Sequence, residues 1–151
     1  TLGTAAGVYS ASNTLDDYEE GTWTPVIKSG SGTIAYSGGM TATYIKIGKQ
    51  VHVQMNLAGG TTSGSAGSTA TIEGLPFQAA GGNYRTTGSH IFFYSSGLRF
   101  SANNTTVHIN ASASKIAPYY QTSGTGGYTP ANISAVGSGS YVFLSATYQI
   151  A

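Results

Sequence analysis

Hydrophobic and polar residues alternate along most of this chain, which is the pattern of β-strands that bury one face. The alternation is clearest from Lys49 to Leu57. One side of this segment carries the apolar residues Val51, Val53, Met55 and Leu57, and the other carries the polar residues Gln50, His52, Gln54 and Asn56. The preceding segment, Thr41–Ile47, also alternates, and Gly48-Lys49 between the two predicts a tight hairpin turn.

Similar segments follow along the chain, separated by Gly, Ser, Asn and Pro about every ten residues, and no segment has helical periodicity. We predict further strands at Thr22–Lys28, Thr69–Glu73, Ser89–Tyr94, Leu98–Ser101, Thr105–Ala111, Lys115–Tyr119 and Ser140–Ile150, with turns at Ser95-Ser96-Gly97 and Asn103-Asn104. We predict long loops at Gly59–Ser68, Gln78–Gly88 and Gln121–Pro130. Residues 1–14 are expected to form a linker or neck from an upstream segment, and residues 15–151 one head domain. The predicted fold is all-β, an antiparallel β-sandwich with a jelly-roll-like arrangement.

Composition supports a folded domain with an unusually neutral surface. Only 7% of the residues are charged, against about a quarter in an average soluble domain. The 40% of hydrophobic residues provide enough apolar surface to offset the entropy of ordering, which argues against disorder. A net charge of +1 does not favour nucleic-acid binding, and the absence of cysteine excludes disulfides and thiolate metal sites.

One segment near the N-terminus, Leu15–Pro25, reads LDDYEEGTWTP. It resembles a signature that opens the C-terminal domain of bacteriophage tail fibre and tailspike proteins. Three later segments resemble the same family in the same order: Tyr44–Val53 (YIKIGKQVHV), Gly74–Phe77 (GLPF) and Ser145–Gln149 (SATYQ). The resemblance implies a homotrimeric β-sandwich head, attached to an upstream fibre shaft on the phage tail. The ligands that it implies are bacterial surface glycans.

Four of the five acidic residues form a cluster: Asp16, Asp17, Glu19 and Glu20. Several carboxylates could bind calcium, but the cluster lacks the spacing of an EF-hand loop. A structural role is favoured, in which the acids cap turns or pair with Lys or Arg at the neck. A solvated loop is the third reading.

The sequence predicts no enzyme. Glycoside hydrolysis normally needs two carboxylates, and Glu73 is the only acid outside the cluster. No G-x-S-x-G motif marks a serine nucleophile. Any depolymerase activity is expected to belong to an upstream domain.

The three histidines, His52, His90 and His108, are not in a metal-binding arrangement. We expect His52 and His108, on the polar sides of strands, to make hydrogen bonds at a surface or interface. The alternative is that one of them lines a threefold axis and binds a metal three times over. We predict no metal and no cofactor.

Eleven tyrosines are more than a core of this size needs, and several fall in or beside the long loops. Tyrosine with Ser, Gly and Asn is typical of recognition loops, where rigid rings and adaptable polar groups contact a ligand together. The candidate glycan-binding residues are Tyr84, Arg85, Tyr119, Tyr120 and Tyr128. A core or subunit-interface role is the alternative for each tyrosine. Trp23 is expected to be a buried anchor.

Three functions are compatible with these features. The first is a trimeric receptor-binding tip that recognises a bacterial surface glycan. The second is a trimerisation or folding cap of the fibre with no ligand of its own. The third is a stand-alone carbohydrate-binding module.

Overall fold

The computed structural model describes residues 17–82, 86–94, 97–101, 105–121 and 127–151. These residues contain fifteen β-strands and no helix, so the all-β prediction is confirmed. The strands are β1 (Tyr18–Thr22), β2 (Val26–Ser29), β3 (Gly32–Thr33), β4 (Ala35–Tyr36), β5 (Gly39–Ile47), β6 (Gln50–Gly60), β7 (Thr62–Ser63), β8 (Ala70–Glu73), β9 (Thr86–Tyr94), β10 (Arg99–Phe100), β11 (Thr105–Ile109), β12 (Lys115–Gln121), β13 (Tyr128–Pro130), β14 (Ile133–Ala135) and β15 (Ser140–Gln149).

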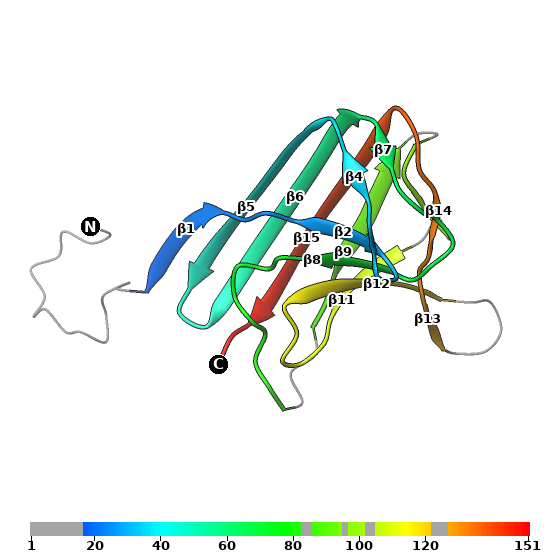
Figure 1. The fold of residues 1–151 in the computed structure, drawn as a ribbon. Coiled ribbons are helices and arrows are strands. Elements are labelled where there is room, and N and C mark those ends of the chain that lie inside the picture. Colours follow the sequence, from blue (N-terminus) through cyan, green and yellow to red (C-terminus); the bar gives the residue numbers. More distant parts are fainter. Residues whose placement is uncertain (1–16, 83–85, 95–96, 102–104, 122–126) are drawn as a thin grey trace, which may run out of the picture.

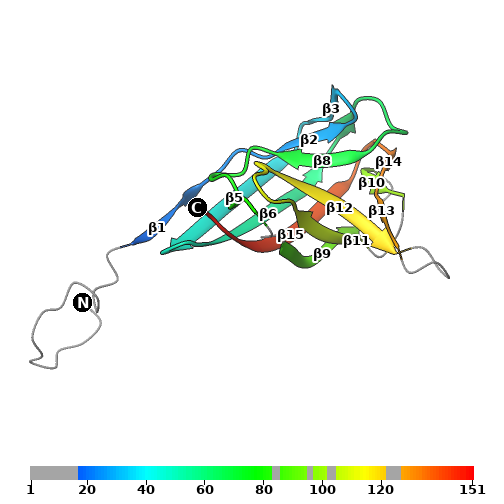
Figure 2. The ribbon, with the colours of Figure 1, turned by 90° about the horizontal axis from the view of Figure 1, so that it is seen from below.

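Most of the strands belong to one antiparallel sheet that folds over on itself. Its order is β1-β5-β6-β15-β9-β11-β12-β8-β2-β3, and β13 joins through β12. The long strands β1, β5, β6 and β15 make one layer, and β11, β12, β8 and β2 make the other (Figures 1 and 2). The two pairs β4–β7 and β10–β14 lie outside this path. The two layers agree with the predicted sandwich, whereas the jelly-roll arrangement and the homotrimer stay predictions.

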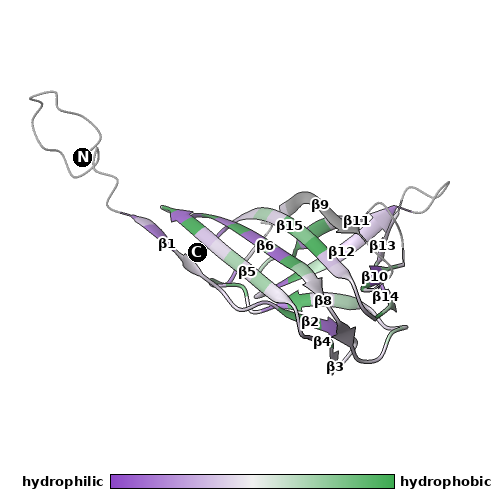
Figure 3. Cartoon of the chain, turned by 90° about the horizontal axis from the view of Figure 1, so that it is seen from above, coloured by the Kyte–Doolittle hydropathy of each residue, from purple (hydrophilic) through white to green (hydrophobic). Residues whose placement is uncertain are grey.

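The hydrophobic core lies between the two layers and follows from the alternation of side chains. All four apolar residues predicted to share one side of β6 are at most 2% exposed. The alternating hydropathy is visible along β5 and β6 in Figure 3. From the opposite layer, Ile27, Ile72, Val107 and Ile116 meet them in the same cluster and are fully buried. β6 and the strands of the opposite layer named here therefore each contribute one face to the core.

The predicted hairpin is confirmed, with β5 ending at Ile47 and β6 beginning at Gln50. Gly48 has a φ of 57°, a left-handed conformation that glycine adopts without a steric penalty. The alternation of Thr41–Ile47 is also confirmed. However, Ile45 and Ile47 point outward, whereas Tyr44 packs against the core.

Trp23 is the buried anchor that the sequence predicts, with 7% of its surface exposed. Its indole Nε1–H donates to the carbonyl oxygen of Gln54 at 3.1 Å, and its backbone N–H donates to Ala42 at 3.1 Å. These bonds tie the segment after β1 to the neighbouring strands of the first layer.

The predicted strand Thr22–Lys28 is wrong as a single element. β1 ends at Thr22 and β2 begins at Val26, and the two strands lie in different layers. Pro25, in the break between them, has no N–H to donate to a sheet. Here the chain passes from one layer to the other.

The predicted loops contain strands that local sequence does not reveal. β7 lies within Gly59–Ser68, β13 lies within Gln121–Pro130, and β9 begins at Thr86 inside Gln78–Gly88. These segments are extended because distant partners pair with them, as β12 does with β13. The predicted Asn103-Asn104 turn and the first two residues of Ser95-Ser96-Gly97 lie outside the described residues.

We expect Gly60→Ala to destabilise the protein. A Cβ at Gly60 would meet the backbone of Gly38, and a Cβ at Gly38 would meet that of Gly60. The cost should be roughly 2 kcal/mol or more of the free energy of unfolding, measured by urea titration with Trp23 fluorescence. Gly39→Ala is the control, since no atom lies within 4 Å of the added Cβ. Equal losses in the two variants would contradict this packing.

We expect Tyr148→Phe to change how stability depends on alkaline pH. Tyr148 is 2% exposed, and its hydroxyl donates to the Phe77 carbonyl at 2.9 Å. Burial raises the pKa of Tyr148 to about 12, although its hydrogen bonding with the Phe77 backbone opposes the rise. Between pH 10 and about 12 the unfolded chain therefore loses a proton that the folded chain keeps, so stability falls as the pH rises.

The Phe variant should show a shallower fall over this window when the free energy of unfolding is measured against pH. Near neutral pH it should be less stable by about 1 kcal/mol, because the hydrogen bond to Phe77 is lost. Parallel pH curves for the two proteins would contradict the assignment.

Candidate functional site: two uncharged or nearly uncharged faces

The outward side of β11, β12 and β13 carries aromatic and amide side chains, and we call it the aromatic face. Cross-strand pairing aligns Thr106 with Tyr119, Tyr119 with Pro130, and Gln121 with Tyr128. Alternate residues of a strand share one side. The aromatic face therefore consists of Thr106, His108, Tyr119, Gln121, Tyr128 and Pro130, with Ala117 opposite His108, and Lys115 continues the same side of β12 beyond it.

The strands beneath this face are held by the core. Val107, Ile109 and Ile116, on the opposite side of β11 and β12, are at most 1% exposed. The hydroxyl of Thr106 also donates to the backbone carbonyl of Tyr119 at 3.3 Å. The face therefore stands on a rigid support.

The rings of the aromatic face differ in exposure. Tyr128 is 67% exposed, the largest value among the exposed large hydrophobic side chains of the described residues. Tyr119 and His108 are half-buried and meet edge to face, with ring centroids 5.2 Å apart at 89°. The perpendicular contact holds the Tyr119 ring in a defined orientation, which favours recognition over free motion.

None of the six side chains is a carboxylate or an ammonium group. Their polar groups are hydroxyls, an amide and an imidazole, which both donate and accept hydrogen bonds. Such a surface suits a neutral ligand rich in hydroxyl groups. It offers no pair of carboxylates for hydrolysis.

The structure brings together two of the five predicted ligand residues, Tyr119 and Tyr128. Tyr120 lies on the opposite side of β12 and packs against the core. Tyr84 and Arg85 lie outside the described residues. The residue that follows them, Thr86, pairs with Ile109 at the end of β11 away from Tyr128.

Sequence reasoning missed Gln121, Pro130 and His108 as parts of this surface. His108 was expected on the polar side of its strand, which is confirmed, but not next to Tyr119. The alternation of side chains along β11 and β12 indicated which residues share one side of each strand. Only the register between the two strands shows that His108 and Tyr119 are neighbours.

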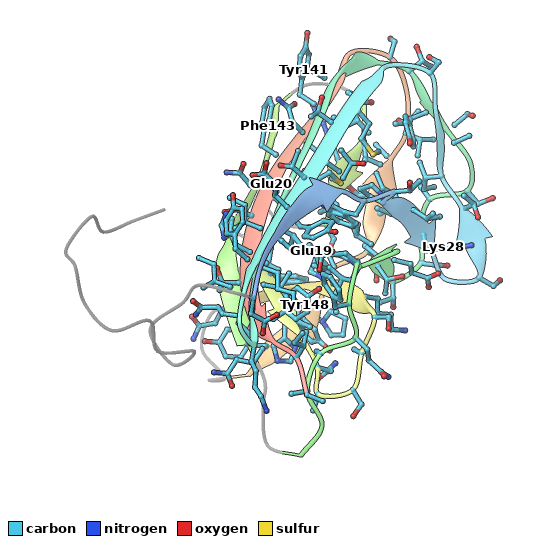
Figure 4. All side chains as sticks on the ribbon, turned by 90° about the vertical axis from the view of Figure 1, so that its left-hand side faces the viewer. Glu19, Glu20, Lys28, Tyr141, Phe143 and Tyr148 are labelled. Carbon is cyan, nitrogen blue, oxygen red and sulfur yellow. The ribbon has the colours of Figure 1, made fainter. Side chains whose placement is uncertain are left out.

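A second surface covers the outward side of the first layer, and we call it the outer face. Tyr141 and Phe143 project from it, whereas Tyr148, on the same strand, lies between the layers (Figure 4). The outer face consists of Tyr18, Glu20 and Thr22 on β1, Thr41, Thr43, Ile45 and Ile47 on β5, Gln50, His52, Gln54 and Asn56 on β6, and Tyr141, Phe143, Ser145, Thr147 and Gln149 on β15.

The outer face contains a shallow groove of about 520 Å³, lined mainly by polar side chains around Phe143. The outward residues that line it are Thr41, Thr43, Gln54, Asn56, Phe143 and Ser145. In the cross-strand row beside the groove, His52 Nδ1 lies 2.9 Å from the hydroxyl of Thr147. Hydrogen bonding at a surface was the expected role of His52, and this contact confirms it.

The acidic cluster has structural partners in the described residues. Lys46 forms a salt bridge with Asp17 at 2.7 Å, which confirms the predicted pairing with a basic residue. The hydroxyl of Tyr44 donates to Glu19 and that of Tyr18 donates to Glu20, both at 2.6 Å. Each hydrogen bond raises the pKa of its tyrosine, because it stabilises the protonated phenol beside a carboxylate.

β1 separates the acids, since Glu19 and Glu20 point to opposite sides of the strand (Figure 4). Asp16 lies outside the described residues. Within residues 17–82 and the later described segments, no three His, Cys, Asp or Glu side chains gather in a possible metal site.

Glu73 lies at the end of β8, in the other layer from β1. It is cross-strand from Lys115, and both line a shallow depression of about 420 Å³. The side chain of the third histidine, His90, lies outside the described residues.

Comparison with known proteins gives a likeness of fold. No protein-family model and no curated protein matches the sequence. The crystal structure of the Dettilon tailspike protein matches with a TM-score of 0.63 and 19% sequence identity. The match covers 87% of this chain and 24% of that one, so this chain spans about a quarter of the tailspike. No helix in the described part of the chain is long and apolar enough to cross a membrane.

The opposite orientations of Tyr119 and Tyr120 lead to a test of the site. Tyr120→Ala should lower the free energy of unfolding by about 1–2 kcal/mol, because a partly buried ring leaves the core. Tyr119→Ala should lower it by less than half as much. Urea titrations of both variants and the parent provide the measurement, and the reverse order would place Tyr120, not Tyr119, on the binding side.

Proposed function

We propose that this chain is the receptor-binding tip of a phage tail fibre or tailspike. In this proposal it works as a homotrimer and binds bacterial surface polysaccharide without chemical reaction. The single observation that carries the proposal is the aromatic face, where Tyr119 and Tyr128 lie on one side of adjoining strands with His108 and Gln121.

The chemistry of this face fits a sugar better than an ion or a nucleic acid. The C–H faces of a pyranose ring are apolar and pack against aromatic rings, while its hydroxyls need donors and acceptors nearby. Tyr128 offers an exposed ring, and Gln121 an exposed amide. A ligand with many phosphates would instead need clustered Lys and Arg, which the aromatic face does not contain.

The place in the virion is supported by two independent likenesses. The segment Leu15–Pro25 resembles the tail fibre and tailspike signature, and the fold is similar to part of a tailspike. A tip of this kind is exposed outside the cell when it acts and is joined to an upstream fibre shaft.

A non-enzymatic role agrees with the placement of the acids. Glu73 lies on β8 in one layer, while Glu19 and Glu20 lie on β1 in the other and accept tyrosine hydrogen bonds. Binding alone is sufficient for attachment, because three copies in one tip multiply a weak single-site affinity.

Substitutions on the aromatic face provide the test. Tyr128→Ala should weaken binding to host polysaccharide, measured by biolayer interferometry on immobilised glycan, by about threefold to tenfold per site, and by more in a multivalent assay. Tyr119→Ala should act in the same direction. Tyr128→Phe, which keeps the ring, should retain most of the binding.

Ser63→Ala, at an exposed position on β7, is the surface control and should bind like the parent. Arg85→Ala belongs in the same series, because Arg85 is a predicted ligand residue outside the described ones. If Tyr119→Ala, Tyr128→Ala and Arg85→Ala all bind whole host cells normally, the glycan site is wrong. The folding-cap alternative then takes its place.

A further inference from the structure

We propose that the outer face is the surface through which copies of this chain pack against one another. This inference rests on the proposed function, since it assigns the contact surface of the homotrimer. It leaves the aromatic face free for the receptor, because β11, β12 and β13 do not contribute to the outer face.

The outer face is an ordered grid. Cross-strand pairs align one row as Thr22, Thr43, Gln54 and Ser145, and the rows on either side are aligned by the same registers. Four adjacent strands therefore present a continuous surface of side chains, with no loop between them. A regular surface of this kind can line a threefold axis, where it meets the same face of two other copies.

Exposed hydrophobic side chains are concentrated at one end of this face. Tyr18, Ile45 and Ile47 are 47%, 41% and 48% exposed, and they are three of the four large hydrophobic residues that the described part of the chain exposes. Tyr18 pairs directly with Ile47, so the three lie side by side on β1 and β5. Tyr141 and Phe143 add aromatic rings toward the other end, with centroids 6.5 Å apart. An apolar patch rimmed by polar residues is typical of a protein–protein contact.

The polar side chains of the face suit a second copy of the same chain. Gln50, Gln54 and Asn56 carry amides that both donate and accept, so identical side chains from three copies can hydrogen-bond to one another around a threefold axis. The outward side of β5, β6 and β15 carries no Asp, Glu, Lys or Arg. Two copies can therefore approach without burying like charges.

The formal charges lie at the margins and have opposite signs. Glu20 is on the edge strand β1, and Lys49 is in the turn that joins β5 to β6. The acid of one copy can therefore meet the base of the next at the rim of the contact, where charge pairs favour correct docking.

The size of the face is adequate for a stable contact. The nine residues of β5 span about 30 Å, and four strands span about 19 Å, so the flat footprint is about 570 Å². Accessible area exceeds flat area where side chains project. The face therefore approaches the roughly 800 Å² that one partner buries in a standard interface.

Native mass is the first test, measured by light scattering on the full chain. The parent should have about three times the mass of one 15.4 kDa chain. Ile45→Glu, which places a carboxylate inside the contact, should shift the mass to that of one chain. Tyr128→Glu is the matched control, since it also replaces an exposed hydrophobic residue by an acid. It should keep the parental mass and lose glycan binding.

A cross-linking test decides the matter if Ile45→Glu fails to fold. The parent has no cysteine, so a single introduced thiol is unique. Gln54→Cys, near the centre of the face, should form covalent dimers with a short bis-maleimide, whereas Ser63→Cys on β7 should not.

Two results would overturn the proposal: a monomeric parent, or an oligomer in which Gln54→Cys cross-links no better than Ser63→Cys. In the second case, Ile45→Glu would also keep the parental mass. A monomer that still binds polysaccharide would reject the outer-face contact and retain the glycan site. An oligomer sensitive to Ile45→Glu that binds no glycan would do the opposite.

Discussion

The pairing of β15 with β6 is the interaction on which the rest of the structure depends. β15 is the last strand in the described sequence, yet it lies inside the first layer, between β6 and β9. Its register with β6 runs from Ser140 opposite Gly60 to Gln149 opposite Gln50. This single strand satisfies the backbone groups of two neighbours that would otherwise be open sheet edges. It also joins the hairpin of β5 and β6 to β9 and β11, where the sheet turns into the second layer.

The same register decides the chemistry of both sides of the first layer. Val142, Leu144 and Ala146 are buried because they face the second layer, and therefore Phe143 and Ser145 must face outward. A slip of one residue would exchange the two sets. The outer face is thus a direct consequence of packing the core, although its composition is not. A solvated sheet has no need to place Ile45 and Ile47 where they are 41% and 48% exposed, which is the reason for assigning a partner to that surface.

Under the proposed function, the two faces have different physical tasks. The outer face offers wide, regular contact area, which suits a permanent association between copies. The aromatic face is smaller, and its exposed Tyr128 and oriented Tyr119 suit a weak, reversible contact with sugar rings. Nearly all the polar groups of both faces are neutral. Neither of the two proposed associations therefore depends on ionic attraction that salt would screen, apart from the margin formed by Glu20 and Lys49.

Local pattern alone was enough to predict the all-β class, the hairpin at Gly48-Lys49, the buried side of β6 and the burial of Trp23. These features depend on residues close together in the sequence, or on a large apolar side chain that has to leave water. Only the tertiary structure decided which side of β5 is buried. The side chain of its inward Lys46 is 13% exposed and forms a salt bridge with Asp17, just before β1, while two isoleucines point outward. The tertiary structure likewise decided that β1 and β13 are strands, and that Tyr120 rather than Tyr119 faces the core. Each is determined by hydrogen bonding to a strand distant in the sequence, and such pairing leaves no signature in the residues of a single segment.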